Sequence, residues 1–265
     1  MPSQIADYGQ DGLLQCLTAP ERPLLTRKTI VIVAHPDEET LACGAVLPRL
    51  TDLTIVHVTD GAPRAPDDAR RRGFGHWAEY ARARRRELES AATIAGVPAP
   101  ALKSLGLPEQ TAALRLATLT RAVLGFIAGA DLVLTHAFEG AHPDLDAVAF
   151  AVAAACGRMR GRRPAVIEMP LYLLGDAGEG AARLRLTSTE RARKARMLAQ
   201  FVTQQEMLLA FGVRDEVYRI APERDFTRPP EGARYRRLDG AISGSRFAQL
   251  ARDARGELGL DAARA

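Results

Sequence analysis

The sequence has little of what stabilises secreted domains or spans membranes. It holds only three cysteines, Cys16, Cys43 and Cys156. An odd, scattered set forms neither a disulfide framework nor a CxxC zinc motif. No apolar run approaches the roughly 20 residues that a membrane-spanning helix needs. The start, "MPSQIADYGQDGLLQ", lacks the basic stretch and apolar core of a secretory signal. We therefore expect a cytoplasmic protein without a membrane span.

Lysine is also scarce. Only Lys28, Lys103 and Lys194 are present among 36 basic residues, and the formal net charge is +4. Arginine binds carboxylate and phosphate groups in a bidentate manner. However, a modest charge that is not confined to one face gives little support for nucleic-acid binding. We expect no nucleic-acid partner.

Apolar residues make up 47% and charged residues 26% of the 265 positions, as in ordinary globular proteins. This length suits one large domain. We interpret residues 1–265 as a single domain, in which residues 28–230 carry the motifs and residues 223–265 form an irregular tail.

Strand and helix patterns alternate along the chain, which predicts an α/β fold: a Rossmann-like, mostly parallel sheet with helices on both faces. The long segment 60–76 is rich in Gly, Pro and charge and is predicted to be a loop, which at this length is usually functional or disordered. The expected strands are 29–34, 53–59, 101–108, 131–136, 164–170 and 217–220, and the expected helices are 39–50, 77–96, 109–129, 144–160 and 188–211.

Two polar clusters follow strands of this predicted sheet. "HPDEE" (35–39) comes directly after the first strand, and "THAFEGAHPD" (135–144) includes the end of "DLVLTH". Ligands of such sheets bind outside the carboxyl ends of the strands. We therefore expect both clusters at one functional edge. The absence of GxGxxG after the first strand argues against a dinucleotide site.

The residue types in "HPDEE" suit a metal site. His35 offers a ring nitrogen, and Asp37 or Glu38 offers a carboxylate oxygen, a combination that binds zinc or a similar divalent ion. Pro36 stiffens the turn. One acid can bind the metal while its neighbour acts as general base. The alternative is an acidic turn that only caps the next helix.

These segments carry a family resemblance. "VAHPDEETLACG" resembles the AHPDDE signature of the PIG-L/LmbE-like N-deacetylases, which are zinc-dependent amidases of N-acetylated sugars. The similarity continues through "HVTDG", the helix at 84–97, "THAFEGAHPD", "RKARMLAQFVTQ" and "YRIAPERDFTRPP", and it covers roughly residues 28–230.

The resemblance implies roles for individual residues. His35 and Glu38 would bind Zn²⁺ or another divalent metal, and Asp37 would be the general base. His142 would stabilise the oxyanion, oriented by Asp144. At the position of the RxxE motif, an arginine would contact substrate.

Three further residues are predicted to bind substrate. Arg84 occupies the RxxE position. Asp60 ends a strand at the functional edge, where a plain turn is the equal alternative. Tyr172 follows the strand at 164–170 and would line the pocket.

One position departs from the family pattern. Where the family has HPDH, with the last His as third metal ligand, this chain reads "HPDL", and Leu145 binds no metal. Catalytic zinc sites normally use three protein ligands. His136 or His142 could substitute, or the site has lost its metal.

Two functions follow from these patterns. One is a metal-dependent hydrolase that removes an acyl group, acetyl in the simplest case, from the nitrogen of an amino sugar or related small molecule. The other is a catalytically impaired homologue that binds a small ligand or partner, because of Leu145. The chain could also form a homo-oligomer.

Overall fold

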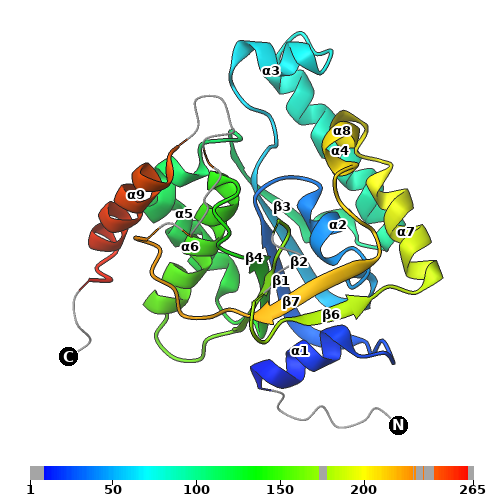
Figure 1. Cartoon of the computed structure of the whole chain (residues 1–265), viewed down its shortest axis with the longest axis horizontal. Helices are drawn as coiled ribbons and strands as arrows, with labels where there is room; N and C mark the ends of the chain where they lie inside the picture. The colour runs from blue at the N-terminus through cyan, green and yellow to red at the C-terminus, as the bar shows by residue number, and fades with distance from the viewer. Residues whose placement is uncertain (1–8, 173–177, 229, 231–234, 236–241, 262–265) are drawn as a thin grey trace.

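A seven-stranded sheet forms the centre of the molecule (Figure 1). The computed structural model describes residues 9–172, 178–228, 230, 235 and 242–261. Its strand order is β3-β2-β1-β4-β5-β7-β6. The first five strands are parallel, and β7 pairs antiparallel with both β5 and β6. The strands are β1 Leu25–Val33, β2 Leu50–Thr59, β3 Leu102–Leu107, β4 Leu132–His136, β5 Ala165–Met169, β6 Ala182–Arg185 and β7 Asp215–Ile220.

Helices cover the sheet on both sides, so the predicted α/β class is confirmed. In Figure 1, α5, α6 and α9 lie on one side of the sheet, and α2, α4 and α7 lie on the other. The helices are α1 Gln10–Thr18, α2 Glu38–Cys43, α3 Pro66–Arg71, α4 Trp77–Ala95, α5 Leu116–Ile127, α6 Pro143–Arg158, α7 Ser188–Leu198, α8 Gln205–Leu208 and α9 Gly244–Glu257.

The central strands are apolar on both faces because helices cover each of them. Residues 29–33 of β1 are all buried, and so is every residue of β4. This double burial explains why their sequences read as continuous β-branched runs rather than as alternating patterns. Their carboxyl ends lead directly into the two polar clusters.

The structure corrects several predicted elements. The expected loop 60–76 contains α3, and the helix expected from residue 39 to 50 ends at Cys43. The helix expected over 188–211 divides into α7 and α8. Thr203 lies in the break, where its backbone N–H and hydroxyl donate to Glu87 of α4 at 2.9 and 2.7 Å. This tertiary contact replaces helical hydrogen bonding.

The C-terminal segment is more regular than expected. Its described part includes α9, which buries Phe247 and Ala251. The strand β6 and the helix α1 were also missed, since short amphipathic elements give weak periodic signals. No helix in the described ranges is both long and apolar enough to cross a membrane.

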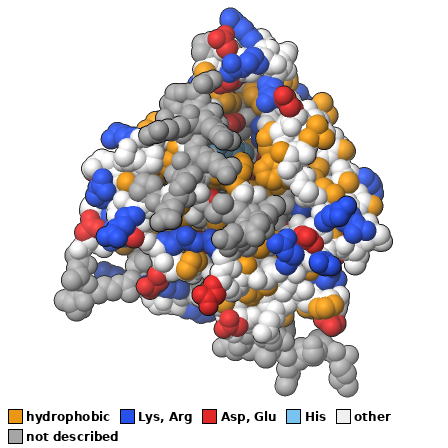
Figure 2. All heavy atoms as spheres, in the orientation of Figure 1, with side chains coloured by type: hydrophobic (Ala, Val, Ile, Leu, Met, Phe, Trp, Pro, Cys, Tyr) orange, Lys and Arg blue, Asp and Glu red, His pale blue; other side chains and the backbone are white. Residues whose placement is uncertain are grey.

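Charges of both signs are mixed on one face of the molecule. Figure 2 shows Lys and Arg side chains spread around this face and interspersed with Asp and Glu.

A buried ion pair ties the helix that carries "HPDEE" to the antiparallel edge of the sheet. Lys194 of α7 donates to Glu216 of β7 at 2.8 Å and to the carbonyl of Leu41 in α2 at 2.7 Å. Both charged side chains are fully buried. Glu216 also accepts from the N–H of Ala45 and from the hydroxyl of Tyr218. The pair therefore fixes α2 against two other elements.

Removing one member of this pair should destabilise the fold strongly. We expect Lys194→Met to lower the free energy of unfolding by about 3–5 kcal/mol, because Glu216 would be left buried and unpaired. The measurement is urea denaturation followed by circular dichroism. Arg85→Met removes the surface pair with Glu89 and should cost about 0.5 kcal/mol or less. Equal losses in the two variants would contradict the prediction.

Candidate active site

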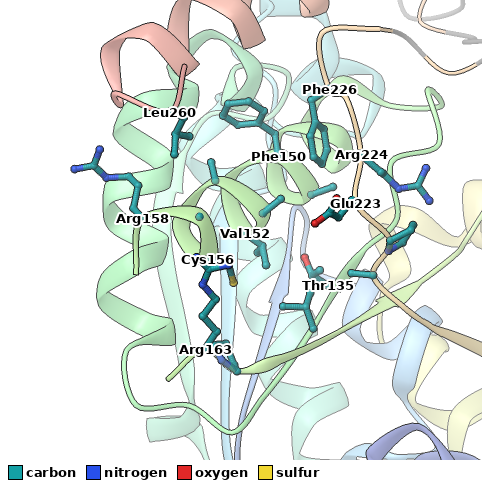
Figure 3. A pocket seen from close by; sticks show the side chains of 18 of the residues that line it. Thr135, Phe150, Val152, Cys156, Arg158, Arg163, Glu223, Arg224, Phe226 and Leu260 are labelled. Atoms are coloured by element: carbon teal, nitrogen blue, oxygen red, sulfur yellow. The ribbon is translucent and has the colours of Figure 1, made fainter. Parts of the chain in front are cut away.

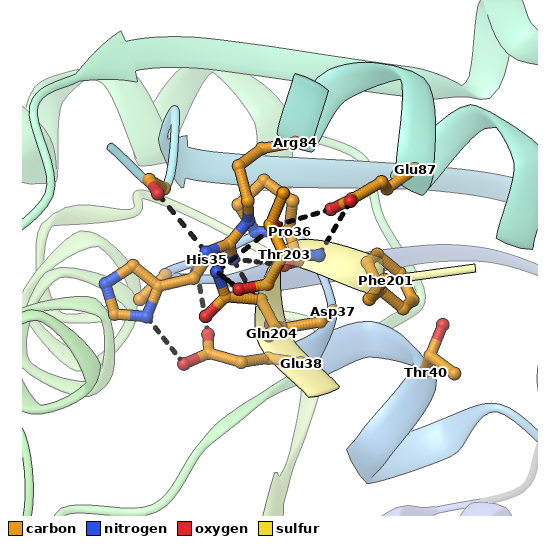
Figure 4. A network of polar contacts seen from close by, with 12 residues as sticks. His35, Pro36, Asp37, Glu38, Thr40, Arg84, Glu87, Phe201, Thr203 and Gln204 are labelled. Carbon is orange, nitrogen blue, oxygen red and sulfur yellow. Dashed lines mark hydrogen bonds and ion pairs between the residues drawn. The ribbon is translucent and has the colours of Figure 1, made fainter. Parts of the chain in front are cut away.

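The turn after β1 concentrates buried charge. His35, Asp37, Glu38 and Glu39 expose 7%, 1%, 4% and 2% of their surface. Asp37 has φ 124°, a backbone conformation that residues other than glycine rarely adopt. Figure 4 shows the turn and the polar side chains that converge on it. The sequence cluster is therefore one compact, strained and dehydrated unit.

Both oxygens of Glu38 are engaged. Oε1 lies 2.8 Å from Nδ1 of His35, and Oε2 accepts from the N–H of His35 at 2.7 Å. Oε2 also lies 2.8 Å from Nε2 of His136, which is buried at the end of β4. Glu38 therefore orients His35 and joins the two polar clusters across the sheet.

Arg84 holds the outside of the turn. Its guanidinium donates to the carbonyl of Pro36 at 2.5 Å, to that of Gly61 at 3.2 Å and to Oδ2 of Asp37 at 3.2 Å. Arg84 is 2% exposed. A Cβ on Gly61, whose φ is +66°, would stand 2.9 Å from both Arg84 and Pro36. Glycine is thus required for this close approach. The structure places Arg84 on the turn, where it positions Asp37.

The remaining acid of the motif is also paired. Glu39 Oε2 lies 3.0 Å from Nε2 of His57 and accepts from the N–H of Asp37 at 3.0 Å. His57 is 1% exposed, as expected for a histidine in a buried strand. Glu39 therefore stabilises the turn from the β2 side.

The second cluster begins α6. Nδ1 of His142 accepts from the backbone N–H of Asp144 at 3.1 Å, which caps the helix. The Asp144 carboxylate does not contact His142 as the orienting role required. Instead it accepts from the N–H groups of Gln110 and Ala112 at 2.6 and 2.9 Å and lies 3.1 Å from Nε2 of His35. The backbone of residue 144, rather than its carboxylate, orients His142.

The fields of neighbouring charges shift the pKa values in the site. Burial and the neighbouring carboxylates of Glu38 and Glu39 raise the pKa of Asp37 well above its ordinary range, against the opposing effect of Arg84. Burial opposes the protonation of His35, but nearby carboxylates outweigh it and raise its pKa. Burial and the neighbouring His35 lower the pKa of His142. The two imidazoles thus differ in proton affinity.

Three side chains from three loops could hold a metal ion. In the described ranges, one group of three potential ligands converges: His35, Glu109 and His142, whose donor atoms lie within 4.8 Å of one another. A tetrahedral ion with bonds of about 2.1 Å separates its ligands by roughly 3.4 Å, so a small inward movement suffices. Two imidazole nitrogens and one carboxylate oxygen suit zinc. These residues fit a divalent metal.

The sequence analysis missed Glu109, although a signal was present. "LPEQ" follows β3, so Glu109 lies at the same edge of the sheet as the two polar clusters. Leu145 is 2% exposed and belongs to the apolar core. His136, considered as a substitute ligand, contacts Glu38 and lies outside the group of three.

The other two residues predicted to bind substrate, Asp60 and Tyr172, make contacts within the protein. Asp60 accepts from the N–H of Ala62 at 3.1 Å and pairs with Arg64 at 2.5 Å, which closes its own loop. Tyr172 is 46% exposed and packs its ring edge-on against Phe211. Desolvation and the nearby carboxylates of Glu38 and Asp37 raise the pKa of Tyr172. Tyr172 thus borders the site.

A polar cleft of about 500 Å³ adjoins Glu109. Its lining carries guanidinium, carboxylate, carboxamide and phenol groups, which can bind the hydroxyl groups of a polar molecule. The lining residues are Pro63, Asp68, Arg71, Arg72, Tyr80, Glu109, Gln110, Gln204 and Glu206.

The fold and the site define a class of protein: an α/β protein with a histidine and carboxylate centre at the carboxyl ends of parallel strands. Residues 30–156 match the family model PIG-L, described as GlcNAc-PI de-N-acetylase. The resemblance to that family is therefore confirmed over this segment. Among curated proteins, no sequence matches the chain significantly.

Solved structures share the fold. The A40926 pseudoaglycone deacetylase Dbv21 aligns with a TM-score of 0.58 at 21% identity and covers 75% of this chain and 99% of its own. A teicoplanin-pathway deacetylase aligns with a TM-score of 0.59 at 16% identity and covers 72% and 96%. At this identity the likeness establishes the fold alone.

A buried acid in α6 gives the fold a pH dependence. Asp146 accepts from the N–H groups of Glu139 and Gly140 at 3.0 Å and from the hydroxyl of Tyr235. Burial raises its pKa to about 7. Between pH 4 and 7 the folded state keeps a proton that the unfolded state releases. This group therefore lowers the free energy of unfolding as pH rises, by at most about 1.4 kcal/mol per pH unit.

Asp146→Asn should remove this dependence, because the amide does not titrate and keeps an acceptor oxygen for the loop. Urea denaturation at pH 5, 6 and 7 measures the difference between wild type and variant. We expect the variant to gain stability relative to wild type as pH rises. Parallel pH profiles would contradict the assignment.

Proposed function

We propose that this protein is a metal-dependent hydrolase that removes an acyl group, acetyl in the simplest case, from the nitrogen of an amino sugar or related small molecule. The observation that carries the proposal is the convergence of His35, Glu109 and His142 at the polar edge of the segment that matches the PIG-L family. Two proteins of similar structure are deacetylases, one of the A40926 pseudoaglycone and one from the teicoplanin biosynthesis pathway, which supports the reaction class.

The proposed metal ligands are His35, His142 and Glu109. We assign Glu38 a supporting role, because its Oε1 contacts Nδ1 of His35 and its Oε2 contacts Nε2 of His136. A carboxylate on the far nitrogen of a ligating histidine is a common supporting contact. When bound, the ion would lower the pKa of a water molecule and polarise the amide carbonyl.

Asp37 is the proposed general base. Its Oδ2 contacts Arg84, while its Oδ1 is buried without a hydrogen-bond partner in the described structure. Oδ1 accepts a proton from the attacking water and returns it to the leaving nitrogen. Amide and water thereby become a carboxylic acid and an amine. His142 was expected to stabilise the oxyanion. Its Nδ1 caps α6, so only Nε2 remains, and we assign that atom to the metal.

The polar cleft beside Glu109 is the proposed substrate site. Its mixed donors and acceptors suit a hydroxyl-rich sugar better than an apolar amide. Tyr172 is not among the residues that line this cleft, and Arg84 would act by positioning Asp37.

An impaired homologue is the alternative function, and Leu145 is the observation that favours it. This side chain occupies the position of the family's third ligand and lies in the core. In that case the site would bind a small ligand without hydrolysing it.

Metal titration tests the ligand set. We expect Glu109→Gln to weaken Zn²⁺ binding by more than about 100-fold in isothermal titration calorimetry. Glu38→Gln should cost roughly 10–100-fold, as for a residue that supports a ligand. Glu206→Gln, on the exposed rim of the cleft, serves as the control and should bind normally. If Glu109→Gln binds normally while Leu145→His tightens binding, the ligand set implied by the family resemblance holds instead.

Hydrolysis tests the base. Asp37→Asn keeps the shape of the side chain but removes the proton acceptor. We expect its kcat/KM to fall by about 10²–10⁴-fold with unchanged Zn²⁺ affinity. The assay follows acetate release from N-acetylglucosamine derivatives. A wild-type protein that binds Zn²⁺ stoichiometrically and releases no acetate from any of them would favour the impaired homologue.

A further inference from the structure

A second cavity lies on the α6 side of the sheet. It has a volume of about 750 Å³ and is bounded by α6, by the ends of β4 and β5, by residues 221–226 and by the end of α9 (Figure 3). His136, which contacts Glu38, lines it, but none of the proposed metal ligands and not the proposed base do so. Its size is that of a site for a small organic molecule.

The floor of this cavity carries a polar group without a partner. Thr135 of β4 pairs with Glu168 of β5, so their side chains lie on the same face of the sheet. Thr135 is 2% exposed, and its hydroxyl has no hydrogen-bond partner in the described ranges. A buried hydroxyl without a partner is unfavourable. Figure 3 shows the Thr135 side chain inside the cavity, near Glu223.

The lining is positively charged. Two acids, Glu168 and Glu223, face five arginines: Arg158, Arg160, Arg163, Arg224 and Arg255. Glu168 is already neutralised, since it lies 2.8 Å from Arg219 and 3.2 Å from Arg224. Arg224 keeps one unused donor, because its Nε is buried without a hydrogen bond in the described structure. The cavity therefore has an excess of cationic donors.

Two of these arginines are available to a ligand. Arg158 donates to the carbonyl of Leu258, and Arg255 pairs with Asp261. By contrast, Arg160 and Arg163 have no hydrogen-bond or ion-pair partner among the described residues. Arg163 extends alongside Cys156 at the mouth of the cavity (Figure 3).

The walls are apolar. Phe150 and Phe226 meet edge-to-face with ring centroids 5.6 Å apart, and Val152, Val166 and Leu260 extend this surface. A ligand with an apolar or aromatic body would cover these side chains. Its anionic group would accept hydrogen bonds from the arginines and from Thr135.

We propose that this cavity is a second ligand site, separate from the hydrolytic centre, for an organic anion: a molecule with an apolar, preferably aromatic, body and one phosphate or carboxylate group. The claim is independent of the deacetylase proposal because the two sites share no proposed metal ligand.

The test uses 1-naphthyl phosphate, which has both features, titrated into the full chain by calorimetry in the presence of EDTA. We expect saturable binding at one site, weaker binding of neutral 1-naphthol and weaker binding of inorganic phosphate. Equal affinity for 1-naphthol would overturn the requirement for an anion, and absence of saturable binding would overturn the site.

Variants locate the probe. Arg160→Gln with Arg163→Gln should weaken binding by about tenfold or more, because two charge-assisted contacts are lost. Ala153→Trp should block the cavity without unfolding the protein, since Ala153 lines the cavity and is exposed. Arg196→Gln, on the exposed surface of α7, should bind normally. Unchanged affinity in the cavity variants, or loss of binding in Glu109→Gln, would place the probe elsewhere and overturn the proposal.

Discussion

The burial of charge on the turn after β1 is the constraint on which the rest of the site depends. A buried ion is tolerated only when it is paired and hydrogen-bonded. Each charge on this turn accordingly meets a partner from another element: Asp37 meets Arg84, Glu38 meets His136, and Glu39 meets a histidine of β2. The turn therefore connects three elements that are far apart in the chain: α4, β4 and β2.

This constraint also explains the strained geometry. Asp37 adopts a positive φ, and the neighbouring loop needs Gly61 to let Arg84 and Pro36 approach. Such strain persists only where the surroundings over-determine the conformation. Lys194 also supports the turn, because it donates to the carbonyl of Leu41 in α2 and to the buried Glu216. The turn is thereby preorganised, with one carboxylate oxygen of Asp37 left unbonded.

The position of Leu145 shows how a site can change without loss of the fold. In the structure a leucine packs into the core at the start of α6, while Glu109 approaches His35 and His142 from the loop after β3. Because parallel strands end at one edge, several loops can supply a ligand there. In the proposed ligand set, Glu109 supplies the third ligand from the loop after β3, and Glu38 supports His35.

The sequence by itself determined the parallel sheet, the polar edge formed by its strand ends, the resemblance to the PIG-L family and the grouping of a histidine with acids at residues 35–39, because each rests on local periodicity or a short motif. Only the tertiary structure decided which atoms meet. Glu109 lies near His35, and the Asp144 carboxylate contacts His35. Both residues are far from His35 in the sequence. Spacing in one chain does not encode such contacts, since they depend on how loops close over the sheet edge.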